Sequence, residues 1–510
     1  MIIVLKPNTS DKDIARVEHQ IKRNGLDTHI VRGQEMTIIG CIGDTTRLDA
    51  RLFEVDASVD KVMHVQEPYK LSNRAFHPED SIIARRIPVM LITEGLCVGL
   101  VGGFVVLLYR VALTFAGDWL VKILSYMKGN PFRCVVWFLI LAALAWIVGK
   151  LVKWEPMISG SGIPQVEGEI AGRLSQNWKR VLPAKFAGGF LCMLGGLSLG
   201  REGPSIQLGA MAGQGISRAL GRGKREEKFL MTCGASAGLS AAFHAPLAGM
   251  MFAVEEIHKT FSIPILLPVM TASVTADYIA SHILGLDPVF RFQITKYLPQ
   301  NYYWLLILLG ILVGVSGVFY NWGMLKAQEL YRKIPFMKET GRLLIAFLTA
   351  GVLGIVMPWV LGSGSGLIVS LTQGEMVLGM VVLTLVMKFL FSAVSFGSGA
   401  PGGIFFPLLI LGALIGAVFA MAGVEFFGLA PVYVNNFVLL GMTGFFTAIV
   451  RAPLTGIILL FEMSGSISQM LSLSIVSVTA YIVATLMRSE PIYDSLLKRI
   501  LKADTIVHDK

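Results

Sequence analysis

The sequence predicts an all-α polytopic membrane domain, made of two duplicated halves with broken helices and preceded by a small α+β domain. Three observations lead to this prediction. Hydrophobic residues make up 54% of the 510 residues and charged residues only 15%, whereas soluble domains carry about 25% charged residues. The first 87 residues are polar and mixed. Three sequence blocks then occur twice in the same order.

The polar start alternates strand-like and helix-like segments. The expected strands are 1–7, 28–33, 36–43 and 59–65. A helix is expected after Ser10, with Ile14, Val17 and Ile21 at helical spacing. A second helix is expected around 48–53. The order βαββαβ is that of the ferredoxin-like split βαβ unit, which we place over residues 1–80.

Apolar windows crowd together after residue 87. Long ones are expected to span a membrane at 88–110, 133–152, 304–322, 343–361, 376–396 and 467–487. Others are apolar but broken by Gly and Pro, at 185–217, 229–255, 397–420 and 438–463. Broken helices at membrane depth are tolerated only where they line a cavity or are buried in protein, so they indicate a transport site.

The broken windows repeat. ISGSGI at 158–163 recurs as GSGSGL at 362–367, an offset of 204. The block at 200–213 recurs at 403–416, and the block at 234–256 recurs at 441–463 with a shared APL-x-G core. We therefore expect two halves, about 88–285 and 300–490, which are inverted relative to each other in transporters of this kind.

The charges indicate an orientation. Arg85 and Arg86 precede the first apolar window, and Lys498, Arg499 and Lys502 follow the last one. Basic flanks favour the cytoplasmic side, so both termini are expected on the cytoplasmic side of the cell membrane. The net charge of +10 then needs no nucleic acid as a partner. No secretory signal is recognisable at the start.

Metal and disulfide chemistry are not indicated. The five cysteines and eight histidines show neither a disulfide framework nor metal-ligand spacing. We expect the cysteines to be small buried apolar residues and the chain to hold no cofactor and no metal.

Three glycine-rich turns precede expected helices at 160–164, 200–204 and 403–407. Each has a proline where the first helical turn would lie, a position at which its missing N–H costs little. Helix N-termini attract anions through free N–H groups and the helix dipole, and glycine allows close approach of the backbone. The sequence thus predicts an anion site built from half-helices.

These turns read GSGIP, GREGP and GGIFFP, and in that order they resemble the three signature motifs of the CLC chloride channel and transporter family. The resemblance covers about 88–500 within a membrane domain of 81–500. It implies the CLC fold, chloride as the substrate and a homodimer in the bilayer. It also implies that 501–510 is a short cytoplasmic tail, without the CBS domains of many eukaryotic relatives.

The resemblance also implies an anion-binding set. Ser161 matches the serine whose hydroxyl coordinates the central anion. Tyr493 matches the tyrosine whose phenol donates to the same ion. Ile404 and Phe405 match positions that offer backbone N–H groups, and Gly203 is counted with them.

Proton coupling is implied by acidic residues. Glu202 matches the gating glutamate, for which the structural alternative is an ion pair with Arg201. Glu256 matches the internal proton-transfer glutamate, whereas Glu255 recurs in the second half and is expected to be structural. Glu167 matches an acidic position near that pathway. The function expected is therefore chloride/proton antiport.

Alternatives stay open at this point. A passive voltage- or pH-gated chloride channel could have the same fold, although an acid at position 256 favours an antiporter. Fluoride export or nitrate transport is disfavoured by Ser161. An enzyme is not expected, because the polar start holds no convincing catalytic constellation.

The polar start has a resemblance of its own. IIVLKP, GQEMTIIGCIGD and EPYKLSNRAFHPED resemble the N-terminal ferredoxin-like domain of one class of DAHP synthase. In that family the domain is ACT-like and binds an aromatic amino acid as a feedback inhibitor. The resemblance implies a regulatory domain that binds such a metabolite; an assembly or stability module is the alternative.

Overall fold

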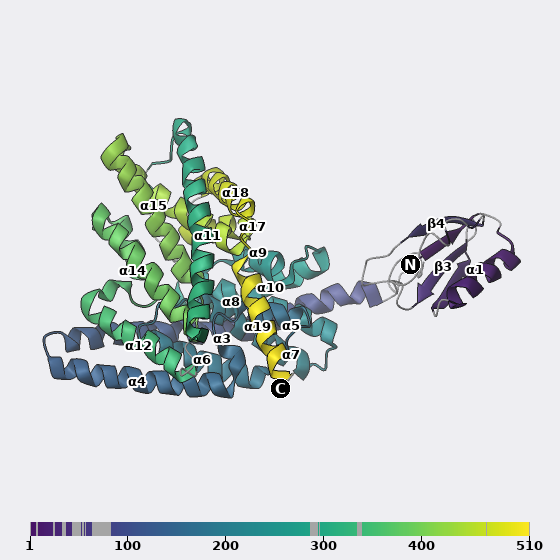
Figure 1. Cartoon of the computed structure of the whole chain (residues 1–510), viewed down its shortest axis with the longest axis horizontal. Helices are drawn as coiled ribbons and strands as arrows, with labels where there is room; N and C mark the ends of the chain where they lie inside the picture. Colours follow the sequence, from purple (N-terminus) through teal and green to yellow (C-terminus); the bar gives the residue numbers. More distant parts are fainter. Residues whose placement is uncertain are drawn as a thin grey trace. The chain divides into compact units, whose positions relative to one another are not determined.

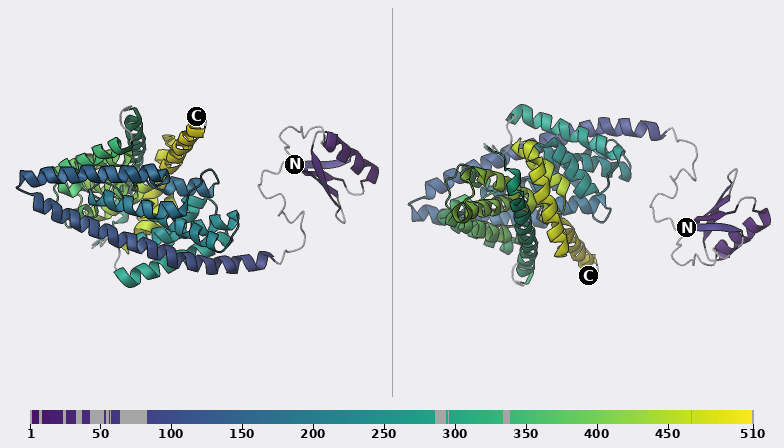
Figure 2. Two further views of the ribbon diagram at one scale, coloured as in Figure 1. Left: turned by 90° about the horizontal axis from the view of Figure 1, so that it is seen from below. Right: turned by 90° about the horizontal axis from the view of Figure 1, so that it is seen from above.

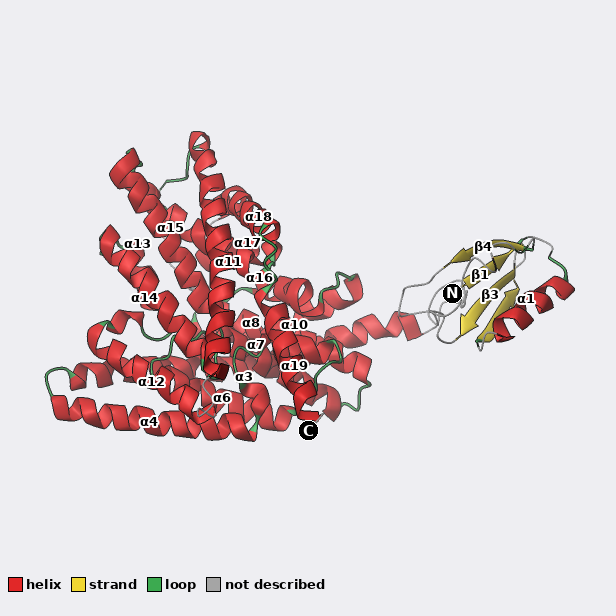
Figure 3. Cartoon of the chain, viewed as in Figure 1, coloured by secondary structure: helices red, strands yellow, loops and turns green. Residues whose placement is uncertain are grey.

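The chain divides into two compact units, Met1–Ile87 and Pro88–Lys510. The computed structural model describes residues 2–6, 9–23, 26–32, 37–42, 53, 56, 58–63, 83–285, 294, 296–333, 339–465 and 467–508. The domain boundary expected at residue 80 falls within 64–82, outside the described residues. Strands are confined to the first unit and helices dominate the second (Figure 3).

The first unit is a four-stranded antiparallel sheet with a helix packed on it (Figure 1). Its elements are β1 (Ile2–Leu5), α1 (Asp11–Arg23), β2 (Asp27–Arg32), β3 (Thr37–Ile42) and β4 (Val59–Met63). The strand order is β2-β3-β1-β4, with Ile3 paired to Ile39 and to Val62. This order is the one expected of a ferredoxin-like domain.

Local sequence explains α1. The Ser10 hydroxyl accepts a hydrogen bond from the backbone N–H of Asp13 at 3.3 Å, as an N-cap does. Ile14, Val17 and Ile21 lie on the buried face, as their spacing predicts, and pack against the sheet. The second expected helix, around 48–53, lies outside the described residues apart from its last position.

The second unit is helical throughout its described part (Figures 1 and 2). Its first half contains α3 (Ile83–Met127), α4 (Pro131–Trp154), α5 (Ile163–Ile170), α6 (Trp178–Leu194), α7 (Glu202–Ala219), α8 (Lys224–Phe243), α9 (Pro246–Phe252), the π-helix η4 (Ala253–His258) and α10 (Ile263–Leu284). Its second half contains α11 (Tyr303–Lys333), α12 (Glu339–Val356), α13 (Ser365–Thr372), α14 (Leu378–Gly397), α15 (Phe405–Phe427), α16 (Val434–Val450), α17 (Pro453–Ser464), α18 (Met470–Leu486) and α19 (Ile492–His508).

Eight helices of the described part are long and apolar enough to cross a membrane. They include α10, which the sequence analysis did not expect because Pro268 and several polar residues interrupt its apolar run. The window at 467–487 yields only the shorter apolar helix α18. Large exposed side chains such as Trp119 and Phe132 lie on these helices, as expected of a surface that faces lipid.

The four broken windows are confirmed. Helix α6 ends before the Gly-rich stretch that leads to α7, and α14 ends before the one that leads to α15. His244 is the C-cap of α8 and Arg451 is the C-cap of α16, and each is followed by Ala-Pro. Both residues have left-handed backbone, with φ of 53° and 73°. The two halves therefore break their helices with the same conformation.

One other expectation was wrong. Cys97 is exposed on α3 and Cys134 is half-buried on α4, so only Cys41, Cys192 and Cys233 are buried cysteines. Helix α19 continues to His508, so the described part of the expected tail is helical.

The alignment of the first repeated block was also wrong. Gly160 and Gly362 share φ values of 68° and 61°, and Gly162 and Gly364 share 95° and 92°. The offset is therefore 202 rather than 204, which makes Ser363 the equivalent of Ser161. The alternation of Gly and Ser in GSGSG fits both alignments equally well, and only the backbone distinguishes them.

Candidate functional site

The candidate site lies where the two halves meet. Gly200, just before α7, and Gly403, just before α15, pair as a short antiparallel bridge. The Gly200 N–H donates to the Gly403 carbonyl at 2.6 Å, and the Gly403 N–H donates to the Gly200 carbonyl at 2.8 Å. Reciprocal bonds between equivalent residues relate the halves by a local two-fold axis. The N-termini of α7 and α15 are thereby brought together.

Ser161 lies in the turn before α5 and is buried at 2% exposure. Its hydroxyl has no hydrogen-bond partner among the residues that the structure describes. Gly203 makes this position possible, because a Cβ there would stand 2.6 Å from the Ser161 carbonyl oxygen. The Ser161 hydroxyl is thus held against the first turn of α7.

A buried lysine holds the same turn. Lys185 of α6 donates to the carbonyls of Ile158 and Gly160 at 2.8 and 2.7 Å. Lys388 of α14 does the same for the second half, donating to Val360 and Gly362 at 2.8 Å each. Both lysines are fully buried. The sequence analysis missed them, although a lone basic residue inside an apolar window is a recognisable signal.

Glu202 is the first residue of α7 and is fully buried. Neither carboxylate oxygen has a hydrogen-bond partner of ordinary geometry in the described part of the chain. One oxygen packs against Gly200, and the backbone N–H groups of Arg201, Glu202 and Phe406 lie close by. The Arg201 guanidinium is 3.7 Å away. The carboxylate thus stands where helix N-termini converge, a position suited to a negative charge.

A cavity of about 900 Å³ lies beside this region. It is lined by Arg201, by Asp118 and Lys128 near the end of α3, and by the turn 362–366 of the second half. Arg201 therefore both lines the cavity and lies 3.7 Å from the buried Glu202.

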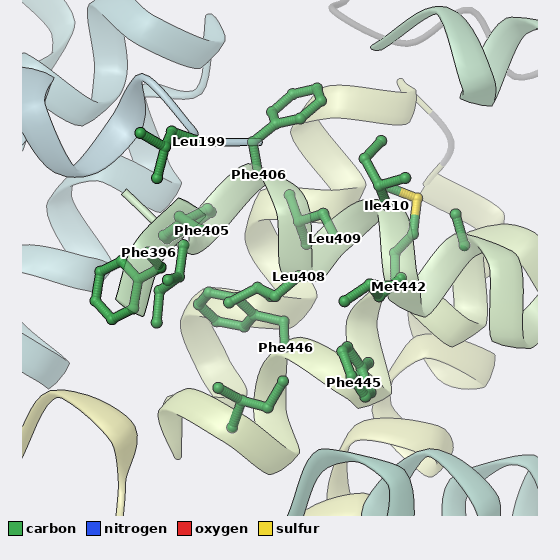
Figure 4. Close-up of a cluster of buried hydrophobic side chains, with 14 of the residues drawn as sticks. Leu199, Phe396, Phe405, Phe406, Leu408, Leu409, Ile410, Met442, Phe445 and Phe446 are labelled. Carbon is green, nitrogen blue, oxygen red and sulfur yellow. The ribbon is translucent and has the colours of Figure 1, made fainter. Parts of the chain in front are cut away.

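Ile404 and Phe405 begin α15 and are 2% and 0% exposed. The Phe405 ring packs against Phe446 and Phe243, with centroids 5.0 and 5.5 Å apart. Figure 4 shows Phe405, Phe406 and Phe446 within this apolar cluster. The side chains of Ile404 and Phe405 pack in the apolar core. The polar groups available at these two positions are therefore the backbone N–H groups of the first helical turn.

Tyr493 near the start of α19 is fully buried, and its hydroxyl has no partner among the described residues. It lies close enough to Glu202, Glu256 and Tyr320 to interact electrostatically with them. The Tyr320 hydroxyl on α11 is likewise buried and unpartnered within the described chain. Sequence reasoning missed Tyr320, since nothing distinguishes it from an ordinary core aromatic residue.

The two adjacent glutamates of η4 differ. The Glu255 carboxylate accepts backbone N–H bonds from Leu454 and Thr455 at 3.3 and 2.8 Å. Glu256 points elsewhere: it is 5% exposed, and one of its oxygens has no partner among the described residues. Glu255 therefore has the contacts of a structural residue, whereas Glu256 keeps a carboxylate oxygen without a partner in the described chain.

Glu167 of α5 is 7% exposed and pairs with Lys259 at 2.5 Å. Lys259 also pairs with Asp494 of α19 at 2.5 Å. Sequence reasoning named Glu167 but neither of its partners, because three distant segments supply the three charges.

A protein-family model described as voltage gated chloride channel matches residues 144–485. The chain belongs to the CLC family. The H(+)/Cl(-) exchange transporter ClcA of Vibrio cholerae is 36% identical to this CLC chain over 460 residues, which cover 86% of the chain and 97% of that relative. ClcA of Citrobacter koseri is 32% identical over 426 residues, covering 82% and 90%.

Solved CLC structures share the fold. The crystal structure of a slow cyanobacterial Cl-/H+ antiporter matches with a TM-score of 0.76 and 30% identity, covering 81% of this chain and 98% of that one. A CLC-type fluoride/proton antiporter matches at 0.65 and 22% identity over 81% of this chain and 98% of its own, which shows the fold alone. A second family model, described as DAHP synthase ferredoxin-like domain, matches residues 1–67. The CLC domain is thus preceded by a ferredoxin-like one.

Proposed function

We propose that this CLC chain exchanges chloride for protons across a lipid bilayer. The observation that carries the proposal is Glu202, a fully buried carboxylate close to the backbone N–H groups of Arg201, Glu202 and Phe406, placed where the N-termini of α7 and α15 meet. Such a group occupies the place of an anion when it is charged and gives that place up when it is protonated. The relatives named as exchange transporters support the same assignment.

The anion site we propose combines side-chain and backbone donors. The hydroxyls of Ser161 and Tyr493 are buried and have no partner among the described residues, so they can donate to an anion. The backbone N–H groups of Ile404, Phe405 and Gly203 belong to helix ends, where they have no partner within their own helix. Donors of this kind hold chloride without a fixed charge that would hold it too tightly.

Glu202 and Glu256 carry the proton in this proposal. A proton that reaches Glu256 from the cytoplasm passes to the region of Tyr493 and then to Glu202. Protonated Glu202 loses its attraction to the helix N-termini and swings away, which lets chloride occupy the site. When Glu202 releases the proton on the other side, its carboxylate returns and displaces chloride, so the two movements are opposed and coupled.

We further propose that the protein is a homodimer in the cell membrane, with one pathway per subunit and both chain ends in the cytoplasm. The basic residues at the start of α3 and along α19 favour that orientation.

The test is proton movement in liposomes that hold the purified protein. A chloride gradient alone should drive protons uphill, measured by a pH electrode outside the vesicles. Glu256→Gln should abolish proton movement and leave chloride flux. Glu202→Gln should abolish proton movement as well, since each variant lacks one of the two carboxyl groups that carry the proton.

The alternative is a passive chloride channel. Chloride flux without uphill proton movement in the unaltered protein would favour the channel and overturn the exchange. Glu255→Gln serves as the control, because Glu255 is the neighbour of Glu256 and is bound to the backbone of α17. It should keep proton coupling.

We also propose that the ferredoxin-like domain binds an aromatic amino acid or a related metabolite and regulates transport. The match to the DAHP synthase domain supports this proposal. Calorimetric titration of the full chain with Phe, Tyr and Trp tests it, with chloride flux measured at each saturating concentration. Absence of binding to the intact protein would leave an assembly or stability role.

A further inference from the structure

Lys259 joins three elements of the membrane domain. Its ammonium lies 2.5 Å from a carboxylate oxygen of Glu167 on α5 and 2.5 Å from one of Asp494 on α19. Lys259 itself ends the π-helix η4 with a left-handed backbone, φ 55°. A single side chain therefore ties α5 and α19 together from a third element.

Each of the three elements also carries a residue of the candidate site. Ser161 precedes α5, Glu256 lies on η4, and Tyr493 directly precedes Asp494 on α19. These residues are 2%, 5% and 0% exposed. The Lys259 side chain is 40% exposed. The bridge thus lies at the exposed edge of the elements whose buried parts present the site.

The charges around Lys259 are unbalanced. Glu167, Asp494 and Glu256 all face it closely enough to interact electrostatically, so one ammonium stands among three carboxyl groups. Without it, the carboxylates of Glu167 and Asp494 would repel each other across the space between α5 and α19. The ammonium therefore draws the two helices together at this edge.

We propose that Lys259 is a positioning residue whose bridge to Glu167 and Asp494 limits how readily the hydroxyls of Ser161 and Tyr493 separate to pass an anion. The proposal rests on the proposed chloride pathway. Loosening the bridge lets α19 move away from α5 more often. Chloride then passes faster, and a larger share of it passes without a proton.

Two substitutions that change the net charge in opposite directions make the test sharp. Lys259→Met removes a positive charge from this edge, and Asp494→Asn removes a negative one. A simple effect of local charge on chloride entry would slow the first variant and speed the second. Loss of the bridge should speed both, by about two- to tenfold in chloride turnover for a partly exposed ion pair.

The measurements are chloride turnover and the ratio of chloride to protons moved, in liposomes. A residue that only supports folding would lower the amount of active protein and leave that ratio unchanged. Both single variants should raise the ratio. The double variant should match the single ones, because each already removes the same link.

The matched control is another ion pair of α19. Lys498 pairs with Glu490 at 2.6 Å, with side chains 60% and 55% exposed, and in the described part of the chain neither residue forms an ion pair with α5. Lys498→Met changes the charge as Lys259→Met does, and it should leave turnover and ratio unchanged. Lys259→Arg, which keeps the charge, should stay close to the unaltered protein.

If Lys259→Met and Asp494→Asn change chloride turnover in opposite directions, a simple charge effect explains the result and the bridge does not. The proposal would also be overturned if both variants had the turnover of the Lys498→Met control, or if both were slower. If Lys259→Met does not fold, Asp494→Asn still gives the test. Should the unaltered protein move no protons, the exchange fails but chloride turnover still decides about the bridge.

Discussion

Glu255 and Glu462 make reciprocal contacts between the two halves of the membrane domain. Glu255 accepts the backbone N–H groups of Leu454 and Thr455 at the start of α17. Glu462 of α17 accepts those of Leu247 and Ala248 at the start of α9, at 3.0 and 2.8 Å. Each carboxylate thus caps the helix of the opposite half, which binds the halves to each other next to the candidate site.

Removing either cap should destabilise the protein. Glu462→Ala leaves two N–H groups of α9 without their acceptor, at a cost of about 1–3 kcal/mol. We expect a lower midpoint of thermal unfolding in detergent and an unchanged ratio of chloride to protons. Glu425→Ala, at an exposed position of α15, is the control and should shift the midpoint little. Equal midpoints for the two variants would contradict the capping role.

Gly203→Ala should weaken chloride binding. The new Cβ would stand 2.6 Å from the Ser161 carbonyl oxygen and would push the Ser161 turn away from α7. Misplacing one hydroxyl donor should weaken affinity by about tenfold, as measured by isothermal titration calorimetry. Gly379→Ala, where a Cβ meets nothing within 4 Å, should bind chloride normally. Normal affinity of Gly203→Ala would remove Ser161 from the proposed site.

The two buried lysines allow a comparison between the halves. Lys185→Met and Lys388→Met should each remove two hydrogen bonds to backbone carbonyl oxygens and destabilise by about 1–3 kcal/mol per bond at most. Only Lys185 supports the turn that carries Ser161. Calorimetry should therefore show weaker chloride binding for Lys185→Met alone. Equal loss of affinity in both variants would count against a site built on Ser161.

The ferredoxin-like domain should lose stability in acid. Hydrogen bonds from the Ser58 hydroxyl and backbone N–H, together with Arg16, hold the pKa of Asp56 below its ordinary value. A carboxyl group whose pKa is lowered by folding stabilises the fold fully above its ordinary pKa and loses that contribution as the pH falls through the lowered value. Asp56 is partly exposed, so the effect is below about 1 kcal/mol.

Hydrogen exchange of the β1 and β4 amides in the intact chain measures this effect. Protection should fall as the pH drops below about 4. Asp56→Asn should lower protection at neutral pH and flatten its pH dependence. A variant with the same pH dependence as the unaltered protein would assign the acid sensitivity to other groups.

Local patterns in the sequence predicted what depends on neighbours in the chain. The buried face of α1 follows from the spacing of Ile14, Val17 and Ile21. The helix breaks at His244 and Arg451 follow from the Ala-Pro pairs behind them. The glycine-rich turns before α5, α7 and α15 lie where the motifs indicated.

Contacts between distant segments could not be predicted in the same way. No role was assigned to Lys259 from the sequence, since its two acidic partners lie 92 and 235 residues away. None was assigned to Lys185 and Lys388 either, because their partners are backbone carbonyls that leave no trace in the sequence. The repeat at 362–367 was placed two residues out of register, since Gly and Ser alternate there and only backbone angles fix the match.

The bridge between Gly200 and Gly403 bears on how the protein is made. Gly200 is synthesised 203 residues before its partner, so a nascent chain that has inserted only its first half holds Ser161 and Glu202 without the amides of α15 or the phenol of Tyr493. In the proposed pathway, the groups that bind chloride therefore come together only after almost the whole chain has been synthesised.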